Sequence, residues 1–325
     1  MSRTGGPRGC QRDPAWRPGR RLPWAIASAL VLCLATGALT VGLHPPGATD
    51  RAFAAADAIE LRAAHGASFV PALDGSGPLF ILALGSDARP GQVVARQRAD
   101  SIHLIGVNPA RHRATILGIP RDSFVAVPGF GSRKINNAMV LGGPELMVRT
   151  VEALTGVRID FYLLTSFKGL ERMVDAVGGL TVDVPYAMDD SFSHAHLRAG
   201  PQRLRGWQAL ALARNRHDTP NGDFSRSLNQ GRLLLSALAQ LRREFEESPG
   251  RLLSWLVIGW RNIKTDLDFD TILELGMTAT QVPATAVNNL VVSGSSGFVG
   301  GASVVFLSPG GGGVYADMRN DGLAG

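Results

Sequence analysis

Apolar residues follow two spacings along the chain, one typical of buried strands and the other of helices. Leu79–Leu84 is apolar throughout, which predicts a strand buried on both faces. The longest amphipathic pattern predicts a helix over 224–245. Other patterns predict strands at 101–107, 115–119, 161–164, 180–184, 290–292 and 303–307, and helices at 145–154, 167–177, 206–213, 252–263 and 271–280. Since strands and helices interleave without a repeat, we expect one α/β domain over 75–325 with a central mixed β-sheet flanked by helices.

The N-terminal end holds an uncharged apolar run at 22–43. A helix of this length spans about 33 Å, enough to cross a bilayer core of about 30 Å. The arginines before it predict a cytoplasmic tail at 1–21, a transmembrane helix at 22–43 and an extracytoplasmic remainder. A cleaved signal peptide is the alternative, although its apolar region is usually shorter. We therefore expect a single-pass protein of the cell membrane.

Two further segments are predicted from composition. Residues 44–74 form an expected extracytoplasmic stalk, in which the alanine-rich stretch 51–65 predicts a short helix. Near the other end, Pro309 and the glycine run 310–313 predict a flexible loop.

The charge distribution argues against a nucleic-acid-binding body. The whole chain has a net charge of +6, of which residues 1–21 contribute +5 through six arginines and Asp13. The remaining residues are therefore almost neutral, and we expect no nucleic acid as a partner. The only cysteines are Cys10 and Cys33, so the body has no internal disulfide, thiolate zinc site or cysteine nucleophile.

Several catalytic signatures are missing from the chain. There is no phosphate-binding loop of the GxxxxGK[ST] type, no HExxH and no GxSxG. His194 and His196 form an HxH pair that would share one face of a strand, but no third ligand is evident. We therefore interpret this pair as part of a solvated loop.

Acidic residues lie where the first two predicted strands meet. Asp87 follows the first strand and Asp100 precedes the second, so antiparallel pairing brings both to one edge of the sheet. Mg²⁺ needs one or two carboxylates and completes its shell with water or phosphate oxygens, which predicts a Mg²⁺ (or Mn²⁺) site there. The alternative is ordinary turn chemistry, with nearby arginines pairing to the aspartates.

A second cluster of polar residues favours an anionic ligand. Arg214 and Arg216 follow the helix at 206–213, and on an extended segment their guanidinium groups face the same way, which suits a diphosphate. Asp223 is the expected N-cap of the next helix, so Arg226 lies in its first turn, where a cation opposes the helix dipole. An anion bound at that N-terminus would account for this arginine, and Gln230 lies on the same face. A surface ion-pair network is the alternative.

In these residues the sequence resembles the LytR-CpsA-Psr (LCP) family of bacterial cell-wall ligases, from about Leu79 to Arg243. The single anchor with an outer catalytic domain is similar to that family, and its actinobacterial members suit the arginine-rich composition. The matching segments are GSDARPG (85–91), RAD (98–100), IPRDSFV (119–125), KINNA (134–138), Gly142-Gly143, VDAVGGL (174–180), GWQALALARNR (206–216) and GDFSRSLNQ (222–230).

The resemblance implies transfer of a glycopolymer from a polyprenyl-pyrophosphate carrier to a peptidoglycan hydroxyl, with Mg²⁺ on the diphosphate and the lipid in an apolar tunnel. It implies Asp87, Asp100 and Arg121 as catalytic residues, and Asp87 and Asp100 as metal ligands. The family often has Arg-Gln where this chain has Asn229-Gln230, so one head-group or structural contact is expected to differ. The implied pyrophosphate-binding residues are Arg98, Arg121, Lys134, Arg214, Arg216, Arg226 and Gln230.

The expected reaction begins with attack of the acceptor hydroxyl on the phosphorus that bears the sugar, and polyprenyl phosphate leaves. Arginines and the metal stabilise the developing charge. An aspartate near the metal is the expected general base, and the sequence does not distinguish Asp87 from Asp100. Two alternatives use the same residues: a pyrophosphatase acting on lipid-linked pyrophosphates, and a non-catalytic polyprenyl-lipid-binding regulator of wall metabolism.

Overall fold

The computed structural model describes residues 59–66, 77–248, 250–251, 255, 263–265 and 267–324. Its centre is a seven-stranded mixed sheet in the order β12-β1-β7-β2-β3-β4-β13. Neighbours β7 and β2, β4 and β13, and β1 and β12 are parallel, and the other pairs are antiparallel. The strands are β1 (Ile59–Ala63), β2 (Leu79–Ser86), β3 (Ala99–Asn108), β4 (Arg113–Gly118), β7 (Phe161–Ser166), β12 (Ile263–Thr265) and β13 (Val287–Val291).

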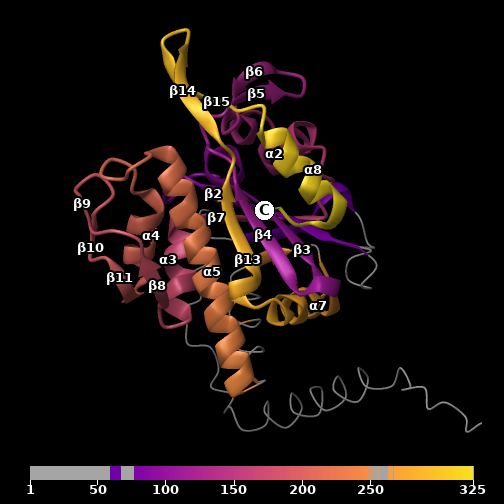
Figure 1. The fold of residues 1–325 in the computed structure, drawn as a ribbon, viewed down its shortest axis with the longest axis vertical. Coiled ribbons are helices and arrows are strands. Elements are labelled where there is room, and N and C mark those ends of the chain that lie inside the picture. The colour runs from indigo at the N-terminus through magenta and orange to yellow at the C-terminus, as the bar shows by residue number, and fades with distance from the viewer. Residues whose placement is uncertain are drawn as a thin grey trace, which may run out of the picture. The chain divides into compact units, whose positions relative to one another are not determined.

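Helices cover both faces of this sheet (Figure 1). One face is covered by α2 (Asn137–Thr155) and α8 (Gly311–Asp321). Helices α3 (Phe167–Ala176), α4 (Gly206–Arg214), α5 (Asp223–Glu247) and α7 (Phe269–Gln281) lie on the other side. The predicted fold class, a mixed sheet flanked by helices, is therefore confirmed for the described residues.

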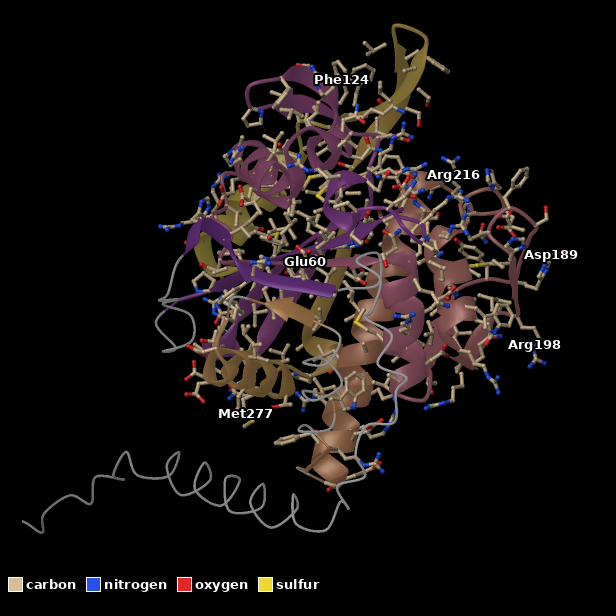
Figure 2. All side chains as sticks on the ribbon, turned by 180° about the vertical axis from the view of Figure 1, so that it is seen from behind. Glu60, Phe124, Asp189, Arg198, Arg216 and Met277 are labelled. Atoms are coloured by element: carbon tan, nitrogen blue, oxygen red, sulfur yellow. The ribbon has the colours of Figure 1, made fainter. Side chains whose placement is uncertain are left out.

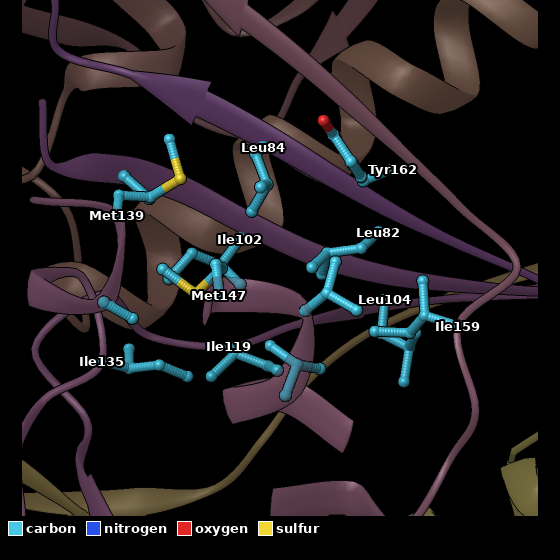
Figure 3. Close-up of a cluster of buried hydrophobic side chains, with 14 of the residues drawn as sticks. Leu82, Leu84, Ile102, Leu104, Ile119, Ile135, Met139, Met147, Ile159 and Tyr162 are labelled. Atoms are coloured by element: carbon cyan, nitrogen blue, oxygen red, sulfur yellow. The ribbon is translucent and has the colours of Figure 1, made fainter. Parts of the chain in front are cut away.

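The face toward α2 and α8 is filled with large apolar side chains. Leu82 and Leu84 on β2 face Leu104 and Ile102 on β3, and all four are almost completely buried. Figure 3 shows them packed with Met139 and others from α2 and neighbouring segments. Helix α2 breaks at Gly143, where φ is 71° just before Pro144, so its second half starts where the sequence predicts a helix.

The opposite face of the same strands carries mostly small side chains in its central part. Ala83 lies opposite His103, and Gly85 lies opposite Ser101. A Cβ atom at Gly85 would lie 2.8 Å from the Cβ of Ser101, so this pair leaves no room for a larger residue at position 85. Because the strand period is two, these positions and the large residues of the filled face alternate along one strand.

A second apolar cluster lies on that side of the sheet. It joins α3, α4 and α5 to β8 (Leu180–Val184), β9 (Met188–Asp190), β10 (Ala195–Leu197) and β11 (Gly200–Leu204). Strands β8 and β11 pair with each other, as do β9 and β10, and neither pair belongs to the central sheet. The predicted strand at 180–184 is thus present, but outside the main sheet.

Two small hairpins complete the described part of the chain. One consists of β5 (Phe124–Val127) and β6 (Gly131–Lys134), and the other of β14 (Gly294–Val299) and β15 (Ala302–Leu307). In Figure 1 the second hairpin projects as an arm. Its base contacts the first, because the amide of Val305 donates to the carbonyl of Asp122.

Two predictions about the ends of the domain are wrong. Ile59–Ala63 is a strand, because it pairs with β7 and β12, and this pairing outweighs the helical preference of alanine. The sheet therefore includes a strand before the expected boundary at 75. The glycine run at 310–313 opens helix α8 instead of forming a flexible loop, since Tyr315 and Met318 are buried in the core.

Other predictions fall on residues that the structure does not describe. The tail at 1–21, the transmembrane helix at 22–43 and most of the stalk lie there, as does most of the helix predicted at 252–263, whose last residue begins β12. Among the described residues, no helix combines the length and apolar character needed to cross a membrane.

Candidate active site

A cavity of about 370 Å³ lies between the small-residue face of the sheet and helices α3, α4 and α5. Its floor includes Ala83, Gly85, Ser101 and His103 from β2 and β3. The helices contribute mainly apolar side chains: Phe167, Leu170, Met173, Leu210, Leu233 and Leu234. Polar residues from loops and strand ends line the rest, so one cavity combines apolar walls with a charged region.

Four arginines from three segments line this cavity, as the sequence predicted: Arg121, Arg214, Arg216 and Arg226. Arg121 follows β4 and forms an ion pair of 2.5 Å with Asp100, which also lines the cavity. Arg121 and Arg216 lie close enough to Arg226 for their charges to lower its pKa, after the larger effect of burial. These cations therefore converge on one place.

Arg226 is the most buried member of the cluster, with 4% of its side chain exposed. It lies in the first turn of α5 and pairs with Asp223. Asp223 is the first helical residue and Gly222 occupies the N-cap, so the predicted cap is displaced by one position. The Nε atoms of Arg121 and Arg226 are both buried without a hydrogen-bond partner in the structure. Buried donors of this kind suit an anionic ligand.

Arg214 and Arg216 flank the end of α4. Arg214 is the last helical residue, and its guanidinium carbon lies 5.2 Å from the centre of the Phe167 ring. Asn215 is extended and completely buried between them. Both arginines line the cavity, and Figure 2 shows Arg216 on the same side of the molecule as Asp189 of β9.

Three predicted site residues do not line the cavity: Asp87, Arg98 and Lys134. The Asp87 amide donates to the Arg98 carbonyl, and burial together with the nearby Asp100 carboxylate raises the pKa of Asp87. The two aspartates therefore lie close together, as the strand pairing predicted. Lys134 is held 3.1 Å from Asp122, the residue that follows Arg121.

Gln230 and Asn229 both serve contacts within the protein. The Gln230 side-chain amide donates to the carbonyls of Asp100 and Ala213, so it connects β3, α4 and α5 at the edge of the cavity. Asn229 is buried and donates to the hydroxyl of Tyr186 at 3.4 Å. The position that departs from the family pattern therefore makes a structural contact rather than lining the cavity.

The cavity also contains residues that sequence reasoning missed. His103 is fully buried, contacts the Ser101 hydroxyl and the Ser227 carbonyl, and has a pKa lowered to about 4 by burial. Asp190, Ser193 and His217 line the same cavity. The one available signal was the small size of Ala83 and Gly85 at alternate positions of β2, opposite His103 and Ser101 on β3.

The HxH pair is solvated, as predicted. His194 lies in an exposed turn, and His196 on β10 is exposed and bonds to Asp189 at 2.5 Å. Within the described residues, no group of three or more histidine, cysteine, aspartate or glutamate side chains is arranged to hold a metal ion.

The fold and cavity define an α/β protein whose cavity has arginines and apolar side chains suited to a ligand with an anionic head and an apolar body. Residues 50–310 match the model of the LytR_cpsA_psr family, and the chain belongs to this family. The resemblance of the motifs is thereby confirmed.

Two relatives and two solved structures illustrate the match. The chain is 35% identical over 203 residues to the "Polyisoprenyl-teichoic acid--peptidoglycan teichoic acid transferase TagU" of Bacillus mycoides (strain KBAB4), covering 62% of this chain and 64% of that protein. It is 39% identical over 185 residues to the "Probable cell wall biosynthesis protein LcpB" of Corynebacterium glutamicum, covering 53% and 43%. The matches thus span less than two thirds of either relative.

The solved structures share the fold. TagV of B. subtilis aligns with a TM-score of 0.61 at 26% identity, covering 75% of this chain and 95% of that one. A structure of YwtF (TagT) with bound octaprenyl pyrophosphate lipid aligns with a TM-score of 0.59 at 22% identity, covering 78% and 93%.

Proposed function

We propose that this protein is a membrane-anchored, extracytoplasmic phosphotransferase that moves a glycopolymer from a polyprenyl-pyrophosphate carrier to a hydroxyl group of peptidoglycan. The observation that carries the proposal is that, within the described residues, one cavity combines clustered arginines with apolar side chains of α3, α4 and α5. Pyrophosphate carries the charge that arginines bind, and a polyprenyl chain is wholly apolar. The name of the TagU relative and the octaprenyl pyrophosphate bound to TagT point to the same substrate class.

The arginines would supply most of the electrostatic stabilisation of the transition state. In phosphoryl transfer, negative charge develops on the transferring oxygens and on the leaving group, here polyprenyl phosphate. Arg226 and Arg121 line the cavity and have buried donors without a partner, and a cation in a partly desolvated site stabilises such charge more than it would in water. The pyrophosphate bond already stores the energy of the reaction, so no nucleotide is needed.

Asp87 and Asp100 would hold a Mg²⁺ (or Mn²⁺) ion. Their proximity, together with burial, raises the pKa of Asp87, and a divalent cation would relieve this repulsion between carboxylates. Two carboxylates suffice for Mg²⁺ when phosphate oxygens and water supply the other ligands. The bound ion would neutralise charge on the pyrophosphate. Asp100 also orients Arg121 through their ion pair.

The apolar run at 22–43 would anchor the protein in the cell membrane, with the basic tail in the cytoplasm. This arrangement would keep the catalytic domain on the side where peptidoglycan is assembled. It would also place the cavity near a donor that is itself confined to the membrane.

The experiment uses the full-length protein in lipid vesicles with Mg²⁺, a synthetic polyprenyl-pyrophosphate disaccharide and peptidoglycan fragments. We expect acceptor-dependent transfer, reduced about 10²–10³-fold in Arg214→Ala and Asp100→Ala, because each loses charge stabilisation in the transition state. Arg111→Ala is the matched control, since this exposed arginine pairs with Asp321 away from the cavity. Thermal unfolding of each variant checks that the fold is retained.

The result can contradict the proposal in three ways. Release of polyprenyl phosphate at the same rate without acceptor would identify a pyrophosphatase. Tight lipid binding without turnover would identify a binding protein. If Asp100→Ala lowers the melting temperature strongly and loses activity only in proportion to unfolded protein, Asp100 serves the fold through Arg121 and not the metal.

A further inference from the structure

A second polar cluster lines the cavity and has no role in the mechanism above: Asp190, Ser193 and His217. Asp190 ends β9, and 4% of its side chain is exposed. It accepts hydrogen bonds from the Ser193 hydroxyl at 2.7 Å and from the amides of Ser193 and Phe192. Although burial raises the pKa of Asp190, these hydrogen bonds lower it overall, so the carboxylate is held ionised in one orientation.

His217 lies against this carboxylate. Its Nδ1 atom is 3.4 Å from Oδ2 of Asp190, and the ring of Phe192 lies 4.7 Å away, centre to centre. The His217 side chain is 47% exposed, so a molecule entering from solution can reach it. An Asp–His pair of this kind fixes the tautomer in which Nδ1 carries the proton, which leaves Nε2 as an acceptor.

The carboxylates beside the arginines are poorly suited to accept a proton from the acceptor. Asp100 is paired with Arg121, and Asp223 is paired with Arg226. Asp87 does not line the cavity, and it would serve as a metal ligand. An ion pair or a metal stabilises the charged form of a carboxylate, so it lowers the basicity of that group. The lining also contains His103, but that histidine is almost completely buried, so among the described lining residues His217 is the histidine that an acceptor from solution can reach.

We propose that His217, held by Asp190, is the general base that activates the acceptor hydroxyl. This inference rests on the proposed phosphotransferase function and assigns the proton acceptor for that reaction. Phe192, which is 73% exposed and lies beside His217 in the cavity lining, offers a flat apolar surface to the acceptor sugar. The acceptor would therefore bind beside His217 and Phe192, in the same cavity as the arginines that would hold the donor.

The proposed step transfers one proton to His217 and the sugar-bearing phosphoryl group to the acceptor oxygen. The acceptor O–H proton moves to Nε2 of His217 as its oxygen forms a bond to the sugar-bearing phosphorus. The bond from that phosphorus to the bridging oxygen breaks, and the electron pair leaves with polyprenyl phosphate. The imidazolium then returns its proton to solvent, which His217 reaches because it is half exposed.

Several charged groups surround this histidine. Asp190 and Asp189 belong to β9, and Asp218 on the loop of His217 accepts a hydrogen bond from the Asp189 amide. Arg214 and Arg216 precede it and also line the cavity, as do Asp100, Arg121 and Arg226. A general base must be unprotonated to accept a proton, so the pH dependence of kcat reports on the group that has this role.

The test measures kcat and KM against pH for the full-length wild type and His217→Gln in the vesicle assay. We expect kcat to fall about 10²–10⁴-fold with KM for the lipid donor nearly unchanged, and the rise of kcat with pH to disappear. His196→Gln is the matched control, because His196 also pairs with an aspartate but lies outside the cavity lining. It should leave rate and pH profile unchanged.

Two further variants separate a base from a merely positioned side chain. In His217→Gly, added imidazole should restore part of the transfer rate. In Asp190→Asn, kcat should fall while KM for the lipid donor stays nearly unchanged, because the carboxylate that orients the imidazole is gone. Circular dichroism at each pH shows whether these variants stay folded.

The outcomes distinguish this inference from the function on which it rests. If the wild type transfers glycan but His217→Gln keeps its kcat and its pH profile, the assignment of the base is wrong and the phosphotransferase stands. The same conclusion follows if only KM for the acceptor rises. If the wild type shows no acceptor-dependent transfer, the proposed function fails and this inference falls with it.

Discussion

The two faces of the central sheet are built from the same strands, but one face forms the core and the other lines the cavity. On β2, Leu82 and Leu84 point into the core beneath α2, whereas Ala83 and Gly85 point toward the cavity. On β3, Ile102 and Leu104 alternate with Ser101 and His103 in the same way. The face toward α2 is fully packed (Figure 3), and the other leaves about 370 Å³. Side-chain volume at alternate positions therefore separates stability from ligand binding.

Shortening a side chain on the packed face should have the largest effect on stability. Leu82 is completely buried, so Leu82→Ala should lower the free energy of unfolding by about 2–5 kcal/mol, through lost burial and the space left behind. Urea denaturation monitored by circular dichroism measures the change. A loss below about 1 kcal/mol would mean that this face tolerates empty space as readily as the other, against the typical cost of such substitutions.

His103 tests whether the cavity face contributes to stability through a polar contact. Its pKa is lowered to about 4 from an ordinary 6.5, so the unfolded chain binds a proton at higher pH than the folded one. The stability is fully present above pH 6.5 and is lost as pH falls toward 4, by about 3 kcal/mol in total. His103→Gln should remove this contribution to the pH dependence.

Urea denaturation of wild type and His103→Gln at several values between pH 7 and 4 gives the measurement. Carboxylates titrate in both proteins, so the difference between their curves isolates the histidine. Parallel curves would show that His103 is not kept neutral by burial beneath α5.

Filling the cavity face should affect binding more than folding. Ala83→Leu adds volume where β2 lines the cavity, so affinity for octaprenyl pyrophosphate should fall about tenfold or more, with little change in melting temperature. Ala126→Leu is the matched control, since Ala126 is exposed on β5. Binding is measured by tryptophan fluorescence and stability by thermal unfolding. Unchanged lipid affinity in Ala83→Leu would show that the lipid lies elsewhere.

Local pattern was enough to predict strands β2, β3, β4 and β7 and helix α5, because continuous apolar runs and amphipathic periodicity are properties of short segments. It failed at β1 and α8, where alanine- and glycine-rich segments take their conformation from distant partners. For β1 the partners are strands β7 and β12. For α8 the partner is the apolar core, in which its own Tyr315 and Met318 are buried. Propensity is a weak guide where tertiary packing decides.

The candidate site also has one part that local sequence predicts and another that only the assembled fold creates. Arg214, Arg216 and Arg226 were predictable because each lies beside a helix end. The local sequence gives no helix-stabilising reason for an arginine at these positions, so a bound anion was the simplest explanation. His217 and Asp190 were not, since they are 27 residues apart and meet only through the fold of the segment between them. The sequence also grouped Lys134 with the anion-binding residues, but its pairing with Asp122 depends on the hairpin β5–β6. Motifs identify residue types, whereas lining a cavity is a property of the assembled chain.

The gathering of arginines at one end of the cavity also couples folding to ligand concentration. Burial lowers the pKa of Arg226, and the charges of Arg121 and Arg216 lower it further, against the opposite effect of Asp223 and Asp100. Folding therefore desolvates one arginine and brings like charges toward it, and the rest of the molecule must supply that free energy. A bound diphosphate cancels the repulsion only in the native state, where these segments meet. At a hundredfold excess over its dissociation constant, such a ligand adds about 2.7 kcal/mol to native stability. The supply of lipid-linked substrate would thereby govern how long each protein molecule survives heat and proteolysis.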